Sequence, residues 1–185
     1  MSNRLIALIA EDETDCDAVR VIARRVLNNQ SLRIKPWAAK GCGNLKKDLP
    51  AKLKAMSNQG CDAFIIIQDL DRNDEAQLRI TLEKASSGVK GVNKHICIPI
   101  EELEAWFWAD PEVVKSVGRG KGNAERNPDL ISSPKEKLIK LSAGENRKPR
   151  YSTNENVKLA ERLNLELCAE RCPSFKNLIE FLRSL

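Results

Sequence analysis

Three groups of acidic residues each follow a short apolar segment of this sequence. The apolar segments are residues 6–10, 64–68 and 96–100. The acids that follow them include Glu11, Asp69, Asp71, Glu101 and Glu104. Carboxylates that are held close together repel one another, and their hard oxygen ligands favour a divalent ion such as Mg²⁺ or Mn²⁺. The pattern therefore predicts a divalent-metal site, provided that the fold brings the three groups together.

The apolar segments predict the elements that position these acids. Unbroken apolar runs of this length are typical of strands buried on both faces of a parallel sheet. Residues 32–37 alternate apolar and basic side chains and predict a further, more exposed strand. Helical spacing predicts helices over residues 15–29, 45–57 and 73–86. This order favours an α/β fold in which helices cover a mostly parallel four-stranded sheet, whose strand ends meet at one edge.

The last third of the chain is expected to be helical. A helix is predicted from Glu101 to Trp108, and further helices are predicted over residues 111–117, 134–141, 154–164 and 174–184. Polar loops rich in glycine, asparagine and basic residues separate them. We therefore expect an α/β domain over residues 1–117 and a helical extension over residues 118–185, packed on the same core.

The acids nearest to the predicted strands have both functional and structural interpretations. Asp69 and Asp71 point to the same side if the strand continues through them, so that they could share one Mg²⁺. A solvated turn is the alternative. Glu11 directly follows a strand, where it could bind a metal or transfer a proton. Asp12 and Asp15 are explained by stabilisation of the first turn of the next helix.

The third acidic group falls in the helix predicted from Glu101. There Glu101 and Glu104 share one face, and Glu102 is expected to face solvent. The aromatic residues beside them suit either the core or a subunit contact, which leaves a homo-oligomer open. These are Trp106, Phe107 and Trp108.

Basic residues gather in the two polar loops of the extension. They are Arg119, Lys121, Arg126, Arg147, Lys148 and Arg150. The net charge of the 185 residues is only +5, so the position of these charges says more than their sum. An acidic centre beside basic loops favours a metal site that acts on the phosphate backbone of nucleic acid. Ordinary solvated charge is the alternative.

The sequence gives no sign of a membrane or of a disulfide framework. No segment approaches the roughly 20 apolar residues that are needed to span a bilayer. The 6 cysteines are scattered, without the spacing of metal ligands. We therefore expect a cytoplasmic protein with reduced thiols and no membrane partner.

Two segments resemble a known family. Glu11-Asp12-Glu13-Thr14-Asp15, followed by Asp69-Leu70-Asp71, resembles the TOPRIM domain of topoisomerases, primases and overcoming-lysogenisation-defect nucleases. Residues 99–110 resemble a segment of TOPRIM-like bacterial proteins linked to defence and mobile elements. The likeness to TOPRIM covers roughly residues 4–110. Asp12 departs from the pattern, because the family usually has glycine there.

The resemblance implies a TOPRIM-like fold and roles for individual residues. It implies that Glu11 is a general acid/base or metal ligand and that Asp69 and Asp71 bind Mg²⁺ or Mn²⁺. Glu104, or else Glu101, would complete the site. Tyr151 is the only tyrosine and lies outside the TOPRIM-like part, so hydrolysis is expected rather than topoisomerase action. The expected function is a nuclease for DNA or RNA, as a phage-defence effector.

Two other functions remain open on the sequence. The first is a non-catalytic TOPRIM-fold module that regulates or assembles with a partner ATPase, since the chain has no Walker phosphate loop of its own. The second is a receiver-like phospho-acceptor, which needs a lysine at a late strand end. None of the apolar segments ends in such a lysine.

Overall fold

A four-stranded sheet forms the centre of the molecule. The computed structural model describes residues 4–89, 91–144 and 148–185. All strands are parallel, and their order is β2-β1-β3-β4. Their bounds are β1 Leu5–Ala10, β2 Arg33–Ala38, β3 Ala63–Ile67 and β4 Asn93–Cys97. The α/β class and the parallel four-stranded sheet are thus confirmed, and the arrangement is consistent with a Rossmann-like fold.

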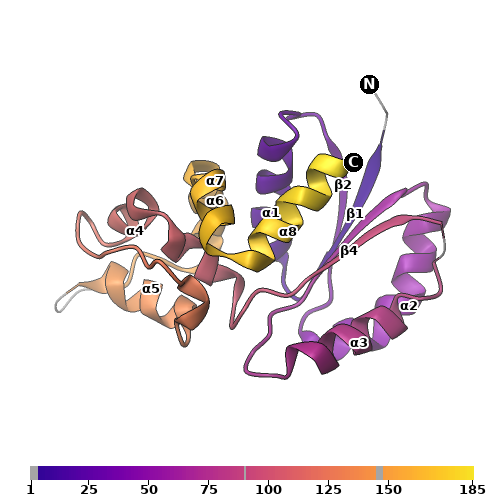
Figure 1. The fold of residues 1–185 in the computed structure, drawn as a ribbon, viewed down its shortest axis with the longest axis horizontal. Helices are drawn as coiled ribbons and strands as arrows, with labels where there is room; N and C mark the ends of the chain where they lie inside the picture. Colours follow the sequence, from indigo (N-terminus) through magenta and orange to yellow (C-terminus); the bar gives the residue numbers. More distant parts are fainter. Residues whose placement is uncertain (1–3, 90, 145–147) are drawn as a thin grey trace.

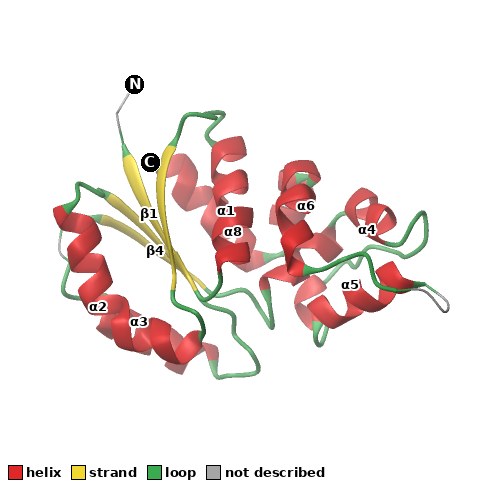
Figure 2. Cartoon of the chain, turned by 180° about the vertical axis from the view of Figure 1, so that it is seen from behind, coloured by secondary structure: helices red, strands yellow, loops and turns green. Residues whose placement is uncertain are grey.

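Helices cover both faces of the sheet, as Figures 1 and 2 show. On one face lie α2 (Cys42–Asn58) and α3 (Glu75–Ala85). On the other lie α1 (Glu13–Val26) and α8 (Pro173–Ser184), and α6 (Asn156–Arg162) packs against α1 from the side away from the sheet. The strands serve both layers because their side chains alternate: Ile65 of β3 belongs to the α1 layer, and Ile66 belongs to the α2 layer. This double burial explains the unbroken apolar segments.

A helical lobe extends beyond the carboxyl edge of the sheet (Figure 1). It contains the 3-10 helices η1 (Leu103–Ala109), η2 (Pro128–Leu130) and η3 (Thr153–Glu155). It also contains α4 (Pro111–Val117), α5 (Pro134–Ala143) and α7 (Leu165–Arg171). The chain then returns from the lobe, because α6 and α8 pack on α1. The predicted extension therefore completes one layer of the sheet.

The aromatic residues of η1 lie inside the molecule. Trp106 and Phe107 are fully buried, and Trp108 is almost so. Trp106 Nε1 donates to Ser174 Oγ (3.0 Å), and Trp108 Nε1 donates to the carbonyl of Pro134 (3.1 Å). Both indole groups are therefore satisfied within the chain. The suggestion that these aromatic residues supply a subunit contact is wrong, and they belong to the core.

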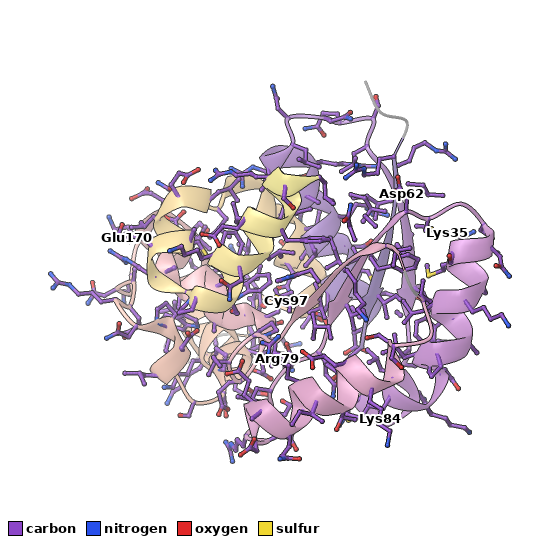
Figure 3. All side chains as sticks on the ribbon, turned by 45° about the vertical axis from the view of Figure 1, so that its right-hand side comes forward. Lys35, Asp62, Arg79, Lys84, Cys97 and Glu170 are labelled. Atoms are coloured by element: carbon purple, nitrogen blue, oxygen red, sulfur yellow. The ribbon has the colours of Figure 1, made fainter. Side chains whose placement is uncertain are left out.

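One residue near each edge of the sheet shows how exposed that edge is. Asp62 marks the amino edge, where it is exposed and lies 3.7 Å from Arg4 in an ion pair (Figure 3). Cys97, at the end of β4, lies in the interior near the opposite edge (Figure 3).

All six cysteines are free. Within the described residues, no helix has the length and apolar character that a membrane crossing requires.

Candidate functional site

The carboxyl edge of the sheet brings together acids from separate elements. Glu11 follows β1 and Asp69 follows β3, and these two strands are adjacent and parallel. Asp15 comes from the first turn of α1, and Glu104 comes from η1. All four have raised pKa values, chiefly because burial disfavours the charged carboxylate. We call these four residues the acidic cluster.

Asp69 is the centre of the acidic cluster. Its Oδ1 accepts a hydrogen bond from the backbone N–H of Leu103 (3.0 Å), which fixes the carboxyl group between β3 and η1. Burial raises the pKa of Asp69 well above its ordinary value, and the charges of Asp15, Glu104 and Glu11 add to the effect. One backbone hydrogen bond does not offset this repulsion, so the site favours a cation or a shared proton.

Glu11 carries an unsatisfied oxygen. Its Oε1 is buried and has no hydrogen-bond partner among the described residues. Burial raises the pKa of Glu11 to about 7, and the charges of Asp71 and Asp12 raise it further than Lys46 and Lys135 lower it. A buried carboxylate oxygen without a donor is costly, and a bound cation or an ordered water molecule would satisfy it.

Asp15 is a member that the sequence interpretation missed. Its sequence position predicts that it stabilises the start of a helix. Its side chain is instead buried in the first turn of α1. Burial raises its pKa to about 7, with further contributions from Glu104 and other neighbouring acids. A signal was present, because Asp15 lies at helical spacing from Ala18, Val19 and Ile22 on the buried stripe of α1.

Glu104 is held from the helical lobe. Its Oε1 accepts from Asn156 Nδ2 (3.0 Å) and lies 3.4 Å from the hydroxyl of Tyr151. That hydroxyl donates to Asn156 Oδ1 (2.6 Å). Burial raises the pKa of Glu104 despite the Asn156 hydrogen bond, and it also raises the pKa of Tyr151. Tyr151 and Asn156 were not predicted, and their sequence positions in and after a polar loop gave no signal.

Asp71 lies at the rim of the site. The backbone turns there, with φ values of 47° at Asp71 and 62° at Arg72. The strand therefore does not continue through Asp71, and Asp71 is exposed while Asp69 is half-buried. The expected strand alternation does not apply, although both carboxylates remain near Glu11. Burial raises the pKa of Asp71, and Glu102 raises it further.

The predicted helix from Glu101 is wrong in its first residues. Glu101 has a φ of 59°, and η1 begins only at Leu103, so Glu101 and Glu104 do not share a helical face. Glu101 lies at the rim, with its Oε2 3.7 Å from Arg72 Nε. Glu102 was expected to face solvent, but it is buried and its Oε1 lies 2.8 Å from Lys135 Nζ.

Lys135 supplies a cation to the acidic cluster. Its ammonium group lowers the pKa values of Glu11, Asp71 and Glu104, although it does not prevent their net rise. Burial disfavours its charge, but the hydrogen bond to Glu102 and the charge of that carboxylate outweigh burial and raise the pKa of Lys135. No sequence signal distinguished Lys135 from its neighbours in α5.

The chemistry of the acidic cluster fits a hard divalent cation. In the described part of the chain, no three His, Cys, Asp or Glu side chains converge closely enough to form a metal site by themselves. Mg²⁺, however, often takes only one or two protein carboxylates and keeps several waters. Such an ion would relieve the repulsion around Asp69 and satisfy Glu11 Oε1. Glu11 and Asp69 are the residues that would hold it, with Asp71 at the rim.

The predicted basic residues line more than one pocket of the helical lobe. Five of them are exposed: Arg119, Lys121, Arg126, Lys148 and Arg150. Arg147 falls outside the described residues. Arg119 and Arg150 line one pocket of the helical lobe together with Tyr151. Arg126 instead lies beside Glu170 and Arg171.

The comparisons with known proteins identify a family without naming an activity. No curated protein and no solved structure matches the chain. One family model matches residues 10–183, a span that includes the whole acidic cluster. The chain therefore belongs to the family described as Domain of unknown function (DUF4276).

Proposed function

We propose that this protein is a Mg²⁺- or Mn²⁺-dependent phosphodiesterase of the TOPRIM type that cleaves DNA or RNA, as an effector of phage defence. One observation carries the proposal. Burial and the charges of Asp15, Glu104 and Glu11 together raise the pKa of Asp69, and Glu11 Oε1 is buried without a donor. Repulsion of this kind is ordinarily maintained only where a cation or proton transfer makes use of it.

Different residues of the site would serve different steps of hydrolysis. Glu11 and Asp69 would hold the divalent ion, which polarises the phosphate and activates a water molecule when it is bound. Asp15 lies beside them with a pKa of about 7, which suits a group that accepts a proton from water near neutral pH. Lys135 places a positive charge where the phosphate gains negative charge during the reaction.

The test is a cleavage assay on labelled DNA and RNA with and without Mg²⁺ or Mn²⁺. Asp69→Asn removes the charge but keeps an oxygen that can accept from the N–H of Leu103. We expect this variant to lose at least about 100-fold in activity. Asp62→Asn, at the amino edge, is the matched control and should cleave like the wild type. Cleavage that survives chelation or the Asp69→Asn change contradicts the proposal.

A non-catalytic module that assembles with a partner ATPase is the second candidate. It is favoured by the absence, among the described residues, of three convergent ligand side chains. Calorimetric titration separates the two functions. The phosphodiesterase requires binding of Mg²⁺ or Mn²⁺ that Asp69→Asn weakens, whereas the module requires none.

A further inference from the structure

A second polar site lies in the helical lobe, away from the sheet. A pocket of about 230 Å³ is enclosed by the end of α4, the end of α5, the segment before η3, and α6. Its lining includes four cations, Arg119, Arg150, Lys158 and Arg162, but only one carboxylate, Glu155. We call it the basic pocket. Neither the acidic cluster nor the proposed metal accounts for it.

Two cations of the basic pocket, Arg150 and Arg162, form no ion pair within the described residues. Glu155 forms an ion pair with Lys158, with 2.9 Å between Oε1 and Nζ. Guanidinium groups that converge on a concave surface are the usual partners of phosphate, which they bind through two parallel hydrogen bonds. Arg150 and Arg162 are therefore available to bind an anion in the pocket.

The walls of the basic pocket are fixed in place. Ser142 is buried, and its Oγ accepts from the backbone N–H groups of Arg150 and Tyr151 (3.1 Å each). Arg119 donates to the carbonyl of Ser142 (3.2 Å). Gly118 makes the approach of the Arg119 loop possible, because a Cβ there would lie 2.1 Å from the carbonyl oxygen of Lys121. Ser142 thus holds the backbone at Arg150 and the side chain of Arg119 in place.

Tyr151 connects the basic pocket to the acidic cluster. It lines the pocket, and its hydroxyl lies 3.4 Å from Glu104 Oε1. Tyr151 therefore lines the basic pocket and also contacts one member of the acidic cluster, so the two sites are neighbours in the fold. This proximity matches a substrate that is gripped at one phosphate and processed near another.

We propose that the basic pocket binds a phosphomonoester, either the terminal phosphate of a nucleic acid strand or a free nucleotide. The excess of positive charge suits the near-dianion of a phosphomonoester better than the single charge of an internal phosphodiester. A concave pocket admits a strand end, whereas a duplex presents its phosphates on a convex surface. The strand-end form of the ligand rests on the proposed function, but phosphomonoester binding does not.

The test measures binding without cleavage. Anisotropy of labelled single strands is recorded with the Asp69→Asn protein in EDTA, using strands that carry a 5′-phosphate, a 3′-phosphate or only hydroxyl ends. We expect one phosphorylated strand to bind at least about tenfold more tightly than the hydroxyl-ended strand. The additional changes Arg150→Gln and Arg162→Gln should abolish this preference. Equal binding of all three strands by the parent protein overturns the proposal.

A matched control removes the same charge elsewhere. Arg33 of β2 and Lys54 of α2 are exposed and do not line the basic pocket, so Arg33→Gln with Lys54→Gln should keep the preference. Thermal melting of the unaltered protein provides a second readout, since inorganic phosphate or a nucleoside monophosphate should raise its melting temperature. Retention of the preference in the Arg150/Arg162 variant, or its loss in the control, contradicts the assignment.

The outcomes also distinguish a strand end from a free nucleotide as the ligand. They further distinguish failure of the basic-pocket proposal from failure of the proposed function. Nucleotides that compete as well as the phosphorylated strand identify a free nucleotide as the ligand, and weaker competition identifies a strand end. A phosphate preference without any nuclease activity supports the basic pocket and rejects the proposed function. Nuclease activity without a preference for the phosphorylated strand supports the proposed function and rejects phosphate binding in the basic pocket.

Discussion

Carboxyl groups that titrate near neutral pH make the acidic cluster sensitive to proton concentration. The pKa values of Glu11 and Asp15 are both raised to about 7, chiefly by burial. The folded protein therefore holds protons that the unfolded chain releases at lower pH. Between about pH 4 and pH 7 this difference lowers the stability of the metal-free protein as pH rises.

We predict that Asp15→Asn removes part of this pH dependence. His95 acts in the opposite direction, because burial lowers its pKa to about 4, but it is present in both proteins and cancels in the comparison. In EDTA, the free energy of unfolding of the wild type should fall relative to that of Asp15→Asn between pH 5 and pH 8. Urea denaturation at each pH measures it. A difference that does not change with pH contradicts the prediction.

We predict that Tyr151→Phe destabilises the protein by about 1 kcal/mol. The change removes the hydroxyl that donates to Asn156 Oδ1 and leaves that buried amide oxygen without this donor. Chemical denaturation measures the loss, with the aromatic ring and its packing retained. An unchanged free energy of unfolding would show that the Tyr151 hydroxyl contributes nothing to holding Glu104.

At the residue scale, the sequence predicts the site residues that directly follow a strand. It does not predict those that come from a helix or from the helical lobe. Glu11 and Asp69 follow buried apolar runs, so their place at the sheet edge follows from parallel pairing alone. Asp15 enters from a helix. Tyr151 reaches Glu104 across 47 positions of the chain. Such a contact depends on the path of the helical lobe, which no local pattern encodes.

Among the elements, η1 and α4 determine how the helical lobe meets the sheet. Asp110 joins them: its Oδ1 accepts from the N–H of Glu112 (2.8 Å) at the start of α4. Its Oδ2 accepts from the N–H of Asn164 (2.7 Å), just before α7. Asp110 is buried, so one carboxylate caps a helix and ties two segments of the lobe together.

We predict that Asp110→Ala costs about 2–3 kcal/mol of stability, because the change removes a helix cap and leaves a second N–H without its acceptor. Asp74→Ala is the matched control. Asp74 caps α3 through one exposed hydrogen bond to Gln77, so its loss should cost only about 1 kcal/mol. Denaturant unfolding of both variants gives the comparison. Equal losses would contradict the tying role of Asp110.

The elements differ in how well the sequence predicts them. Unbroken apolar runs predict buried strands, and helical spacing of apolar residues predicts long amphipathic helices, so the sheet and its helices follow from the sequence. The start of η1 was not, because Glu101 adopts a left-handed conformation that no glycine signals. The start of the short helix α7 does not follow from the sequence either, since the preceding predicted helix includes its cap, Asn164.

On the scale of the whole molecule, helices α6 and α8 are part of the core and do not merely pack on its outside. Leu159 of α6 and Phe175 of α8 belong to the same buried cluster as Ile22 of α1 and Ile65 of β3. A core that is closed by the end of the chain should unfold as one unit.

We predict that a chain ending at residue 150 does not fold cooperatively. Its loss of α6 and α8 exposes the apolar face of α1 and removes Asn156 from Glu104. Calorimetry should show a single two-state transition for the full chain and none for the shortened one. Two transitions in the full chain, or a native-like melt of the shortened chain, would contradict this prediction.

The central claim is that the acids at the carboxyl edge of the sheet hold a divalent cation. Anomalous diffraction from crystals soaked in Mn²⁺ tests it most directly, with Asp69→Asn crystals soaked in parallel. The account predicts a manganese peak bound by the carboxylates of Glu11 and Asp69 in the wild type and a weakened or missing peak in the variant. A saturated wild-type crystal without that peak, or with manganese only elsewhere, would contradict it.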